Sequence, residues 1–263
     1  MNVRPTIDRD RATPRDDYRI LAVASGKGGV GKTWLSITLA QALAAHRKRV
    51  LVFDGDLGLA NVDIQLGLMP KTDLQTVFSG QVPLKAAVMP YKLGDFDLIA
   101  GRSGSGGLAS LPMDRLEALG DRLVRLADEY DHVLIDLGAG IEKTVRQLAR
   151  PASTILVVTN EEPTSLTDAY AFIKLTARDR PGADIRIVVN TAQSPGAGKH
   201  TYGTLAKACE NFLKFTPPLA GIIRRDPHIP DSIRHQTPLL SRHPNSIAAS
   251  DVEAIVARLT ERK

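Results

Sequence analysis

Residues 26–33 read Gly26-Lys27-Gly28-Gly29-Val30-Gly31-Lys32-Thr33, which has the GxxxxGKT spacing of a phosphate-binding loop. Its glycines tolerate positive φ, so the backbone N–H groups can turn inward as a concave nest for phosphate oxygens. Lys32 adds a positive charge for the β and γ phosphates, and the Thr33 hydroxyl can bind Mg²⁺. The stretch therefore predicts a site for a nucleoside triphosphate with Mg²⁺.

The residues on either side of this loop support the same interpretation. Arg19 to Ala24 (RILAVA) is a short β-type run, and Leu35 to Ala45 carries apolar residues at helical spacing. A strand, a loop and a helix in this order place phosphates at the positive N-terminus of the helix. The alternative is a Gly-rich turn with an incidental lysine, and the flanking pattern counts against it.

Two further apolar runs end in carboxylates. Val50 to Asp56 (VLVFDGD) ends in Asp54 and Asp56, and Val133 to Gly140 (VLIDLGAG) contains Asp136. Because ligands of open α/β sheets bind at the carboxyl ends of strands, we expect these carboxylates to face the same crevice as the loop. Aspartates that only cap helices or solvate turns are the alternative. Three of them at strand ends favour a metal and catalytic site.

Strand-like and helical patterns alternate along the rest of the chain. Strands are predicted at 96–100, 154–158, 185–189 and 219–223, with helical spacing at 114–129 and 166–176. This alternation predicts parallel strands with helices on both faces. With 263 residues and 43% hydrophobic content, the expected fold is α/β: a single P-loop NTPase domain over residues 19–263, with a mainly parallel doubly wound sheet flanked by helices.

Two segments are expected to lie outside the regular structure. Residues 1–18 hold four Arg and four Asp with very little apolar content, which predicts a disordered N-terminal arm. Residues 101–107 (GRSGSGG) predict a flexible surface loop near the nucleotide crevice.

The lysine that precedes the glycines allows a family comparison. With Lys27 the loop reads KGGVGKT, and the chain resembles the MinD/ParA ATPases, the deviant Walker A family. In that family two protomers enclose two ATP molecules, so the resemblance implies an ATP-dependent homodimer in which Lys27 reaches the partner's phosphates. It also implies that Asp54 and Asp136 hold the Mg²⁺ waters beside Thr33, and that Asp56 orients the attacking water. The implied activity is slow, partner-regulated ATP hydrolysis, catalysed with Lys27, Lys32 and Asp56.

The resemblance extends to the nucleotide-binding residues. It implies contacts from the loop residues Gly26, Lys27, Gly28, Gly29, Val30, Gly31, Lys32 and Thr33, from Trp34 directly after them, and from Asn190 and Asp226 toward the base. Two positions depart from the family pattern. Trp34 stands where the family usually has Thr or Asn, and Arg224 stands where it has Pro.

Two stretches resemble one branch of the family, the flagellar-number ATPases (FlhG, also called FleN). They are 54–68 (DGDLGLANVDIQLGL) and 162–174 (EPTSLTDAYAFIK), with a weaker match at 238–249. This resemblance implies a switch ATPase that regulates flagellar number or placement. The implied partner is a flagellar regulatory protein: an FlhF-like GTPase, a transcription regulator or a basal-body component. Residues 1–18 lack the DQAxxLR-like helix with which that branch stimulates FlhF.

The charge of the chain keeps a second function open. The net charge is +5, and residues 199–263 hold ten Lys or Arg against six Asp or Glu. Such an excess can bind phosphate backbones, as the DNA-partitioning members of the family do. A ParA-like ATPase that positions DNA or another cargo is therefore the alternative.

The last helix and the overall composition bear on location. One cysteine, no apolar run near ~20 residues and no secretory h-region predict a cytoplasmic protein. Residues 246–263 show one apolar face, formed by Val252, Ile255, Val256 and Leu259. We expect this helix to pack on the domain, because only four residues follow Leu259. The alternative is a membrane anchor, which would place the protein peripherally at the membrane or the cell pole.

Overall fold

The computed structural model describes residues 19–70, 77, 82–101 and 111–261. The arm expected at 1–18 and residues 102–107 of the expected Gly-rich loop lie outside these ranges.

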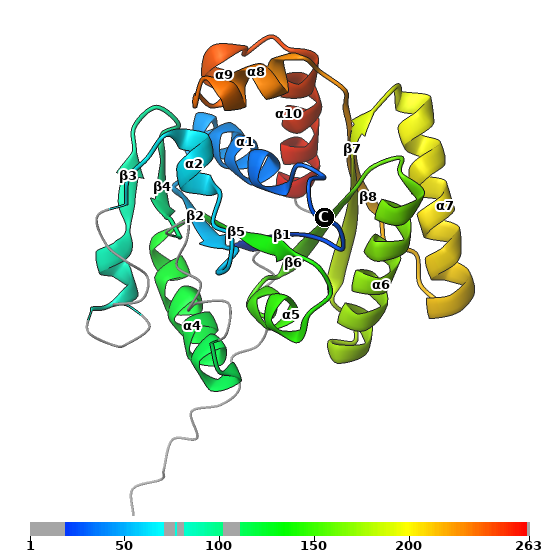
Figure 1. Cartoon of the computed structure of the whole chain (residues 1–263), viewed down its shortest axis with the longest axis horizontal. Helices are drawn as coiled ribbons and strands as arrows, with labels where there is room; N and C mark the ends of the chain where they lie inside the picture. Colours follow the sequence, from blue (N-terminus) through cyan, green and yellow to red (C-terminus); the bar gives the residue numbers. More distant parts are fainter. Residues whose placement is uncertain (1–18, 71–76, 78–81, 102–110, 262–263) are drawn as a thin grey trace, which may run out of the picture.

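The described residues form one eight-stranded sheet in the order β3-β4-β2-β5-β1-β6-β7-β8 (Figure 1). Strand β3 pairs antiparallel with β4, and the other neighbours are parallel. The strands are β1 (Ile20–Ser25), β2 (Val50–Gly55), β3 (Met89–Tyr91), β4 (Phe96–Ile99), β5 (His132–Ala139), β6 (Thr154–Thr159), β7 (Asp184–Ala192) and β8 (Leu219–Arg224). The prediction of a mainly parallel doubly wound sheet is confirmed.

Helices cover both faces of this sheet (Figure 1). One face carries α1 (Lys32–Ala45), α2 (Val62–Leu66), α8 (His228–Arg234), α9 (Leu239–Arg242) and α10 (Ile247–Thr260). The other carries α4 (Met113–Leu126), α5 (Lys143–Ala149), α6 (Pro163–Asp179) and α7 (Pro195–Leu213). Two 3₁₀ turns, η1 (Leu84–Ala87) and η2 (Ala127–Glu129), complete the described elements.

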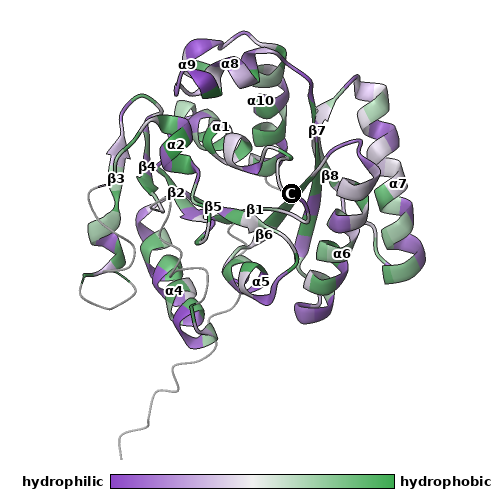
Figure 2. Cartoon of the chain, viewed as in Figure 1, coloured by the Kyte–Doolittle hydropathy of each residue, from purple (hydrophilic) through white to green (hydrophobic). Residues whose placement is uncertain are grey.

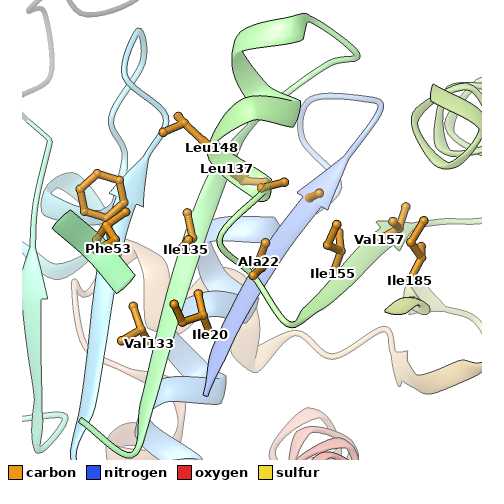
Figure 3. Packing of buried hydrophobic residues seen from close by; sticks show 14 of the residues in the cluster. Ile20, Ala22, Phe53, Val133, Ile135, Leu137, Leu148, Ile155, Val157 and Ile185 are labelled. Carbon is orange, nitrogen blue, oxygen red and sulfur yellow. The ribbon is translucent and has the colours of Figure 1, made fainter. Parts of the chain in front are cut away.

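Alternation along the strands divides the core into two layers. In β1, Ile20 and Ala22 join the cluster under α4–α7, while Leu21 and Val23 join the cluster under α1 and α10. Figure 3 shows the first of these layers, with apolar side chains from neighbouring strands meeting on one face. Since successive side chains point to opposite faces and both faces are covered, the strands read as continuous apolar runs. Figure 2 shows the matching pattern, with apolar residues along the strands and hydrophilic ones on the outer sides of helices such as α4 and α7.

The last helix contributes its apolar face to the core. Val252, Ile255, Val256 and Leu259 are all buried, in the same cluster as α1 and β8. Each such side chain contributes about 1.5–3 kcal/mol when it is removed from water. The apolar face of α10 is therefore used inside the domain, as expected of a packed last helix. No helix within the described ranges has the length and apolarity needed to cross a bilayer.

Candidate functional site

The phosphate-binding loop joins the end of β1 to the start of α1, at the centre of the sheet. Gly29 and Gly31 both have positive φ, 77° and 91°, which a residue with a side chain rarely adopts. A Cβ placed on Gly29 would meet nothing within 4 Å, so that side of the loop is open. The loop thus has the conformation and the free space of a nest for phosphate oxygens.

The loop is fastened to the domain from two sides. A Cβ on Gly26 would lie 2.1 Å from the carbonyl oxygen of Asp168, so α6 packs directly against the loop backbone. A Cβ on Gly31 would lie 2.4 Å from Nδ2 of Asn190, which donates a hydrogen bond to the carbonyl of Val30 (2.8 Å). Glycine is required at both positions because the neighbouring groups occupy the space of a side chain.

Lys32 is a buried cation at the base of the loop. Only 8% of the residue is exposed, and its Nζ donates a hydrogen bond to Oγ of Ser25 at 2.9 Å. Burial lowers the pKa of Lys32, while the nearby carboxylates of Asp136 and Asp56 act in the opposite direction. A buried ammonium beside a neutral hydroxyl is suited to meet the charge of incoming phosphates.

Two of the predicted carboxylates are neighbours in the sheet. Asp54 on β2 and Asp136 on β5 are partners in the parallel register, and both are fully buried. Burial, and then the charge of Asp136, raises the pKa of Asp54 to about 8. Burial likewise raises the pKa of Asp136 to about 6, although hydrogen bonds from Thr33 and Ser36 oppose the shift. Two carboxylates that destabilise each other's ionised form favour a cation as their common partner.

The hydrogen bonds around these carboxylates hold them in place. Asp54 accepts the backbone N–H groups of Asp56, Asn61 and Val62, each at 3.2 Å. Asp136 accepts the hydroxyl of Ser36 at 2.9 Å. The loop after β2 is thereby fixed to the end of its own strand.

The donors present fit Mg²⁺, which prefers oxygen and keeps several waters. Thr33 supplies a hydroxyl that hydrogen-bonds Asp136, so the predicted metal-binding oxygens of Thr33 and Asp136 do lie together, and Asp54 is the sheet neighbour of Asp136. Within the described residues no group of three or more His, Cys, Asp or Glu is arranged to hold a metal by itself. An ion bound here would take its remaining ligands from phosphates and water.

Asp56 lies at the mouth of the site, less buried than the other two. Its Oδ1 accepts the N–H of Leu59 at 3.0 Å. A Cβ on Gly138, two residues after Asp136 in β5, would lie 3.2 Å from the same oxygen, so the Asp56 carboxylate rests against the last part of β5. The structure thus brings Asp56 to the same strand ends as Asp54 and Asp136, as expected.

Lys27 is engaged within its own chain. Its Nζ forms an ion pair with the carboxylate of Glu162 and donates a hydrogen bond to Oγ1 of Thr164 at 2.9 Å. Both acceptors stand at the start of α6. The sequence reasoning did not identify them as partners of Lys27, although they lie in the 162–174 stretch singled out there.

The residues expected at the base have partners inside the domain. The amide nitrogen of Asn190 donates a hydrogen bond to the carbonyl of Val30, and its amide oxygen accepts one from the N–H of Thr191 (2.9 Å). Asp226 accepts hydrogen bonds from the N–H and the ring Nδ1 of His228, at 2.9 and 2.7 Å, and from the N–H of Ala248 at 2.9 Å. Asn190 is therefore part of the loop's support, while Asp226 joins the start of α8 to α10.

Arg224, which replaces the family's Pro, also bonds within the domain. Its guanidinium pairs with the carboxylate of Asp251 on α10, with the shortest contact at 2.7 Å. The pair fixes the end of β8 to the last helix.

Trp34 packs between helices. Only 4% of it is exposed, and a narrow cavity beside it is lined by Leu66 of α2, Ile233 of α8 and Leu239 of α9. Its indole Nε1 is buried with no hydrogen-bond partner among the described residues. The side chain therefore fills a contact between helices.

Two hydroxyl groups in the site were not predicted from the sequence. Ser25 precedes the loop and accepts from Lys32, while Ser36 stands one helical turn after Lys32 and donates to Asp136. The four-residue spacing of Lys32 and Ser36 on α1 was the available signal, because residues at i and i+4 share a helix face.

Comparison with known families and proteins agrees with this geometry. Residues 21–239 match the CobQ/CobB/MinD/ParA nucleotide binding domain family. The chain is 35% identical to the antiactivator FleN of Pseudomonas aeruginosa over 241 residues, which covers 92% of this chain and 86% of FleN. It is 29% identical to the flagellum site-determining protein YlxH of Helicobacter pylori, over 94% of this chain and 84% of YlxH.

The fold also matches solved structures. The septum site-determining protein MinD of Pyrococcus horikoshii, complexed with Mg-ADP, superposes with a TM-score of 0.78 at 24% identity. The match covers 92% of this chain and 96% of MinD. At that identity the likeness concerns the arrangement of the strands and helices.

Proposed function

The chain belongs to the CobQ/CobB/MinD/ParA nucleotide-binding family and is a P-loop ATPase with ATP and Mg²⁺ as cofactors, and we propose that it acts as an ATP-dependent dimerising switch in flagellar regulation. The observation that carries the proposal is the combination of KGGVGKT with 35% identity to FleN over nearly the whole chain. The location we propose is the cytoplasm.

The proposed chemistry is phosphoryl transfer to water, in which positioning and charge do nearly all the catalysis. The N–H groups of the loop hold the phosphates, and Lys32 faces their negative charge from the buried side. Thr33, Asp54 and Asp136 would hold Mg²⁺ and its waters, and the ion would supply positive charge to offset that of the phosphates. Asp56, at the mouth, orients the attacking water.

Lys27 links this chemistry to association. In the proposed dimer it leaves Glu162 and Thr164 and reaches the phosphates bound by the partner protomer. Its charge is then neutralised across the interface, and loss of the γ-phosphate removes part of that attraction. The result is a switch of the γ-phosphate type, which favours dimer before hydrolysis and monomer after it.

The partner we propose is a flagellar regulatory protein: an FlhF-like GTPase, a transcription regulator or a basal-body component. Two similar proteins support the flagellar assignment: the antiactivator FleN and the flagellum site-determining protein YlxH. The apolar face of α10 is buried in the domain, so we propose that peripheral association with the membrane or the cell pole, where it occurs, involves such a partner.

The biochemical test measures the oligomeric state with ATP, with ADP and without nucleotide. Light scattering coupled to gel filtration should find dimer with ATP only. Lys32→Ala should stay monomeric, and Asp56→Ala should accumulate ATP-bound dimer with reduced turnover. Lys207→Ala, which removes an exposed lysine on α7, is the matched control. Dimerisation of Lys32→Ala with ATP would show that the loop is not the switch.

The cellular test counts flagella per cell, and maps their positions, in a strain whose chromosomal copy carries Lys32→Ala. Changed number or placement supports flagellar regulation, provided that the Lys207→Ala strain resembles its parent. Unchanged flagella would favour the alternative, a ParA-like ATPase that positions DNA or another cargo, for which the net charge of +5 is the motivating observation. ATP-dependent, salt-sensitive retention on non-specific DNA would then be expected.

A further inference from the structure

A second cavity lies at the edge of the sheet opposite to the phosphate loop. Its volume is about 690 Å³, and it is lined by the end of α1, the start of β2 and the turn between β3 and β4. Helix α1 runs from the loop to this cavity: Lys32 begins it and Ala45, at its end, lines the cavity (Figure 1). Fourteen helical residues span about 20 Å, so this cavity is separate from the nucleotide site.

Three cations in the cavity wall have no short ion pair with a described residue, although Lys48 lies near enough to Asp131 to help lower the pKa of that carboxyl. Arg47 and Lys48 follow α1, and Lys92 lies across the cavity in the β3–β4 turn. Within the described part of the chain none of the three side chains forms an ion pair within 4 Å. Arg49, the fourth lining cation, lies 3.7 Å from Asp131. Long cationic side chains grouped around one cavity favour an anion there.

The lining carboxylates compensate this charge only in part. Glu129 pairs with Lys85 at 2.6 Å, and Asp97 accepts the hydroxyl of Tyr130 at 2.8 Å. Asp95 is the one lining carboxylate that has no hydrogen bond or ion pair with another described residue. Asp97 keeps its negative charge, because a hydroxyl donor is neutral. Among the described lining residues, three cations (Arg47, Lys48 and Lys92) therefore face two carboxylates, Asp95 and Asp97, that have no ion pair.

The end of α1 does not oppose an anion as strongly as a bare helix C-terminus would. The N–H groups of His46 and Lys48 bond the carbonyl of Leu43, and that of Arg47 bonds the carbonyl of Ala44. Capped carbonyls have less negative charge to offer to the cavity.

The floor of the cavity is aromatic. Tyr91 and Phe96 contact each other with ring centroids 5.3 Å apart, and Tyr130 stands beside them with its hydroxyl on Asp97. A cavity of this volume with an apolar floor and a few charged groups has the character of a small-molecule site. The cations select the anionic end of a ligand and the aromatic floor selects its body.

We propose that this cavity binds a small organic phosphate, with its phosphate group toward Arg47, Lys48 and Lys92 and an aromatic or apolar body against Tyr91, Phe96 and Tyr130. The site is independent of the ATP site. The protein would then have a second anion-binding site, beside the C-terminal end of the helix whose N-terminus follows the phosphate loop.

The test titrates phenyl phosphate into protein saturated with Mg-ADP, so that the phosphate loop is filled, and measures heat by calorimetry. One saturable site is expected, with a dissociation constant on the order of 1 mM or below. The variant Lys48→Glu/Lys92→Glu should weaken it about tenfold or more. Lys207→Glu, an exposed charge reversal on α7, should leave it unchanged, and benzyl alcohol should not bind.

Four outcomes would overturn the proposal. They are absence of saturable binding with the nucleotide site filled, competition between phenyl phosphate and ADP, and equal weakening by Lys207→Glu. The fourth is pelleting with phosphatidylglycerol vesicles that depends on Lys48 and Lys92 while phenyl phosphate does not bind. That result would assign the cations to a lipid headgroup.

Discussion

The ammonium group of Lys27 and the carboxylate of Glu162 form an ion pair within one chain, joining the phosphate loop to the start of α6. Thr164 adds a hydrogen bond to the same ammonium. Because the proposed dimer needs Lys27 at the partner's phosphates, this pair must break before association. Glu162 then acts against dimerisation in the monomer.

Glu162→Gln should promote the ATP-bound dimer. The change keeps the shape of the side chain and removes its charge, so Lys27 is released more readily. We expect the protein concentration at half dimerisation to fall about threefold, the usual scale of an exposed ion pair. Sedimentation velocity with ATP measures this, with Glu210→Gln on α7 as the control. Weaker dimerisation in Glu162→Gln would show that Glu162 serves the dimer instead.

Asn190→Ala should weaken nucleotide binding because Asn190 supports the phosphate loop; its predicted contact with the base stays a prediction. The amide of Asn190 holds the carbonyl of Val30, and its loss leaves the loop less well ordered. A hydrogen bond of this kind contributes about 1 kcal/mol, so the affinity for ADP should fall roughly fivefold. Fluorescence of Trp34, the single tryptophan, can report binding. An unchanged affinity would remove Asn190 from the support of the loop.

Gly31→Ala tests the same contact from the other side. Its φ of 91° and the 2.4 Å approach of Asn190 leave no space for a methyl group. Nucleotide binding should be lost more completely than in Asn190→Ala, while Gly203→Ala on α7, where the space is open, should bind normally. Partial recovery in the double variant Gly31→Ala/Asn190→Ala would confirm that the two groups compete for space.

Asp136→Asn should keep or raise the thermal stability of the nucleotide-free protein while it weakens the binding of Mg-ADP. Burial disfavours the charge of this carboxylate, so its removal should leave the thermal midpoint of the nucleotide-free protein unchanged or higher at pH 8. The gain in midpoint from Mg-ADP should largely disappear, because one of the metal-facing oxygens is lost. Differential scanning fluorimetry with and without Mg-ADP checks both results. Full retention of the Mg-ADP effect would contradict the assignment.

Trp34→Thr, which installs a residue common in the family, should destabilise this chain. It empties the space between α1, α2 and α9, and losses of large buried rings cost about 3–5 kcal/mol. Trp34→Phe should cost less, since it keeps most of the volume and removes an indole N–H that has no partner among the described residues. Urea denaturation followed by circular dichroism measures both. Equal stability of wild type and Trp34→Thr would show that the ring is not needed for packing.

Cys209 provides a pH-dependent probe of the α7 layer. Burial raises the pKa of its thiol to about 11, above its ordinary value near 9. The thiolate is therefore disfavoured in the folded state, and this contribution to stability, present below pH 9, is lost as the pH rises from about 9 to about 11. A thiol reagent at pH 8 should react only after denaturation, with one equivalent. Rapid reaction with native protein would show that α7 opens readily.

The sequence predicted the central strands and the site because local pattern and local structure agree there. Strands β1, β2 and β5 are apolar runs in the sequence. The phosphate loop follows β1, and aspartates lie at or near the ends of β2 and β5. The strand pairing brings these residues to the same end of the sheet. Strand β3 was missed, since Met89-Pro90-Tyr91 is three residues long and contains a proline. Proline is tolerated there because β3 is an edge strand.

Contacts between distant segments could not be read from the chain. Lys27 finds Glu162 across 135 positions, and Asn190 finds Val30 across 160. Neither pairing leaves a local signal, because each depends on how α6 and the end of β7 are placed around the phosphate loop. The expected adenine contact of Asp226 stays a prediction. Its carboxylate accepts hydrogen bonds from His228 and Ala248 and so joins the start of α8 to α10.

The register between β2 and β5 sets the distance between Asp54 and Asp136 through backbone pairing, not through loops. A slip of one residue would turn every side chain of a strand, including its aspartate, to the opposite face. The spacing of the two carboxylates is consequently a product of correct strand pairing, and a sheet with a shifted register would not bring them together. The distance between the two carboxylates can therefore change only if the strand pairing in the middle of the sheet changes as well.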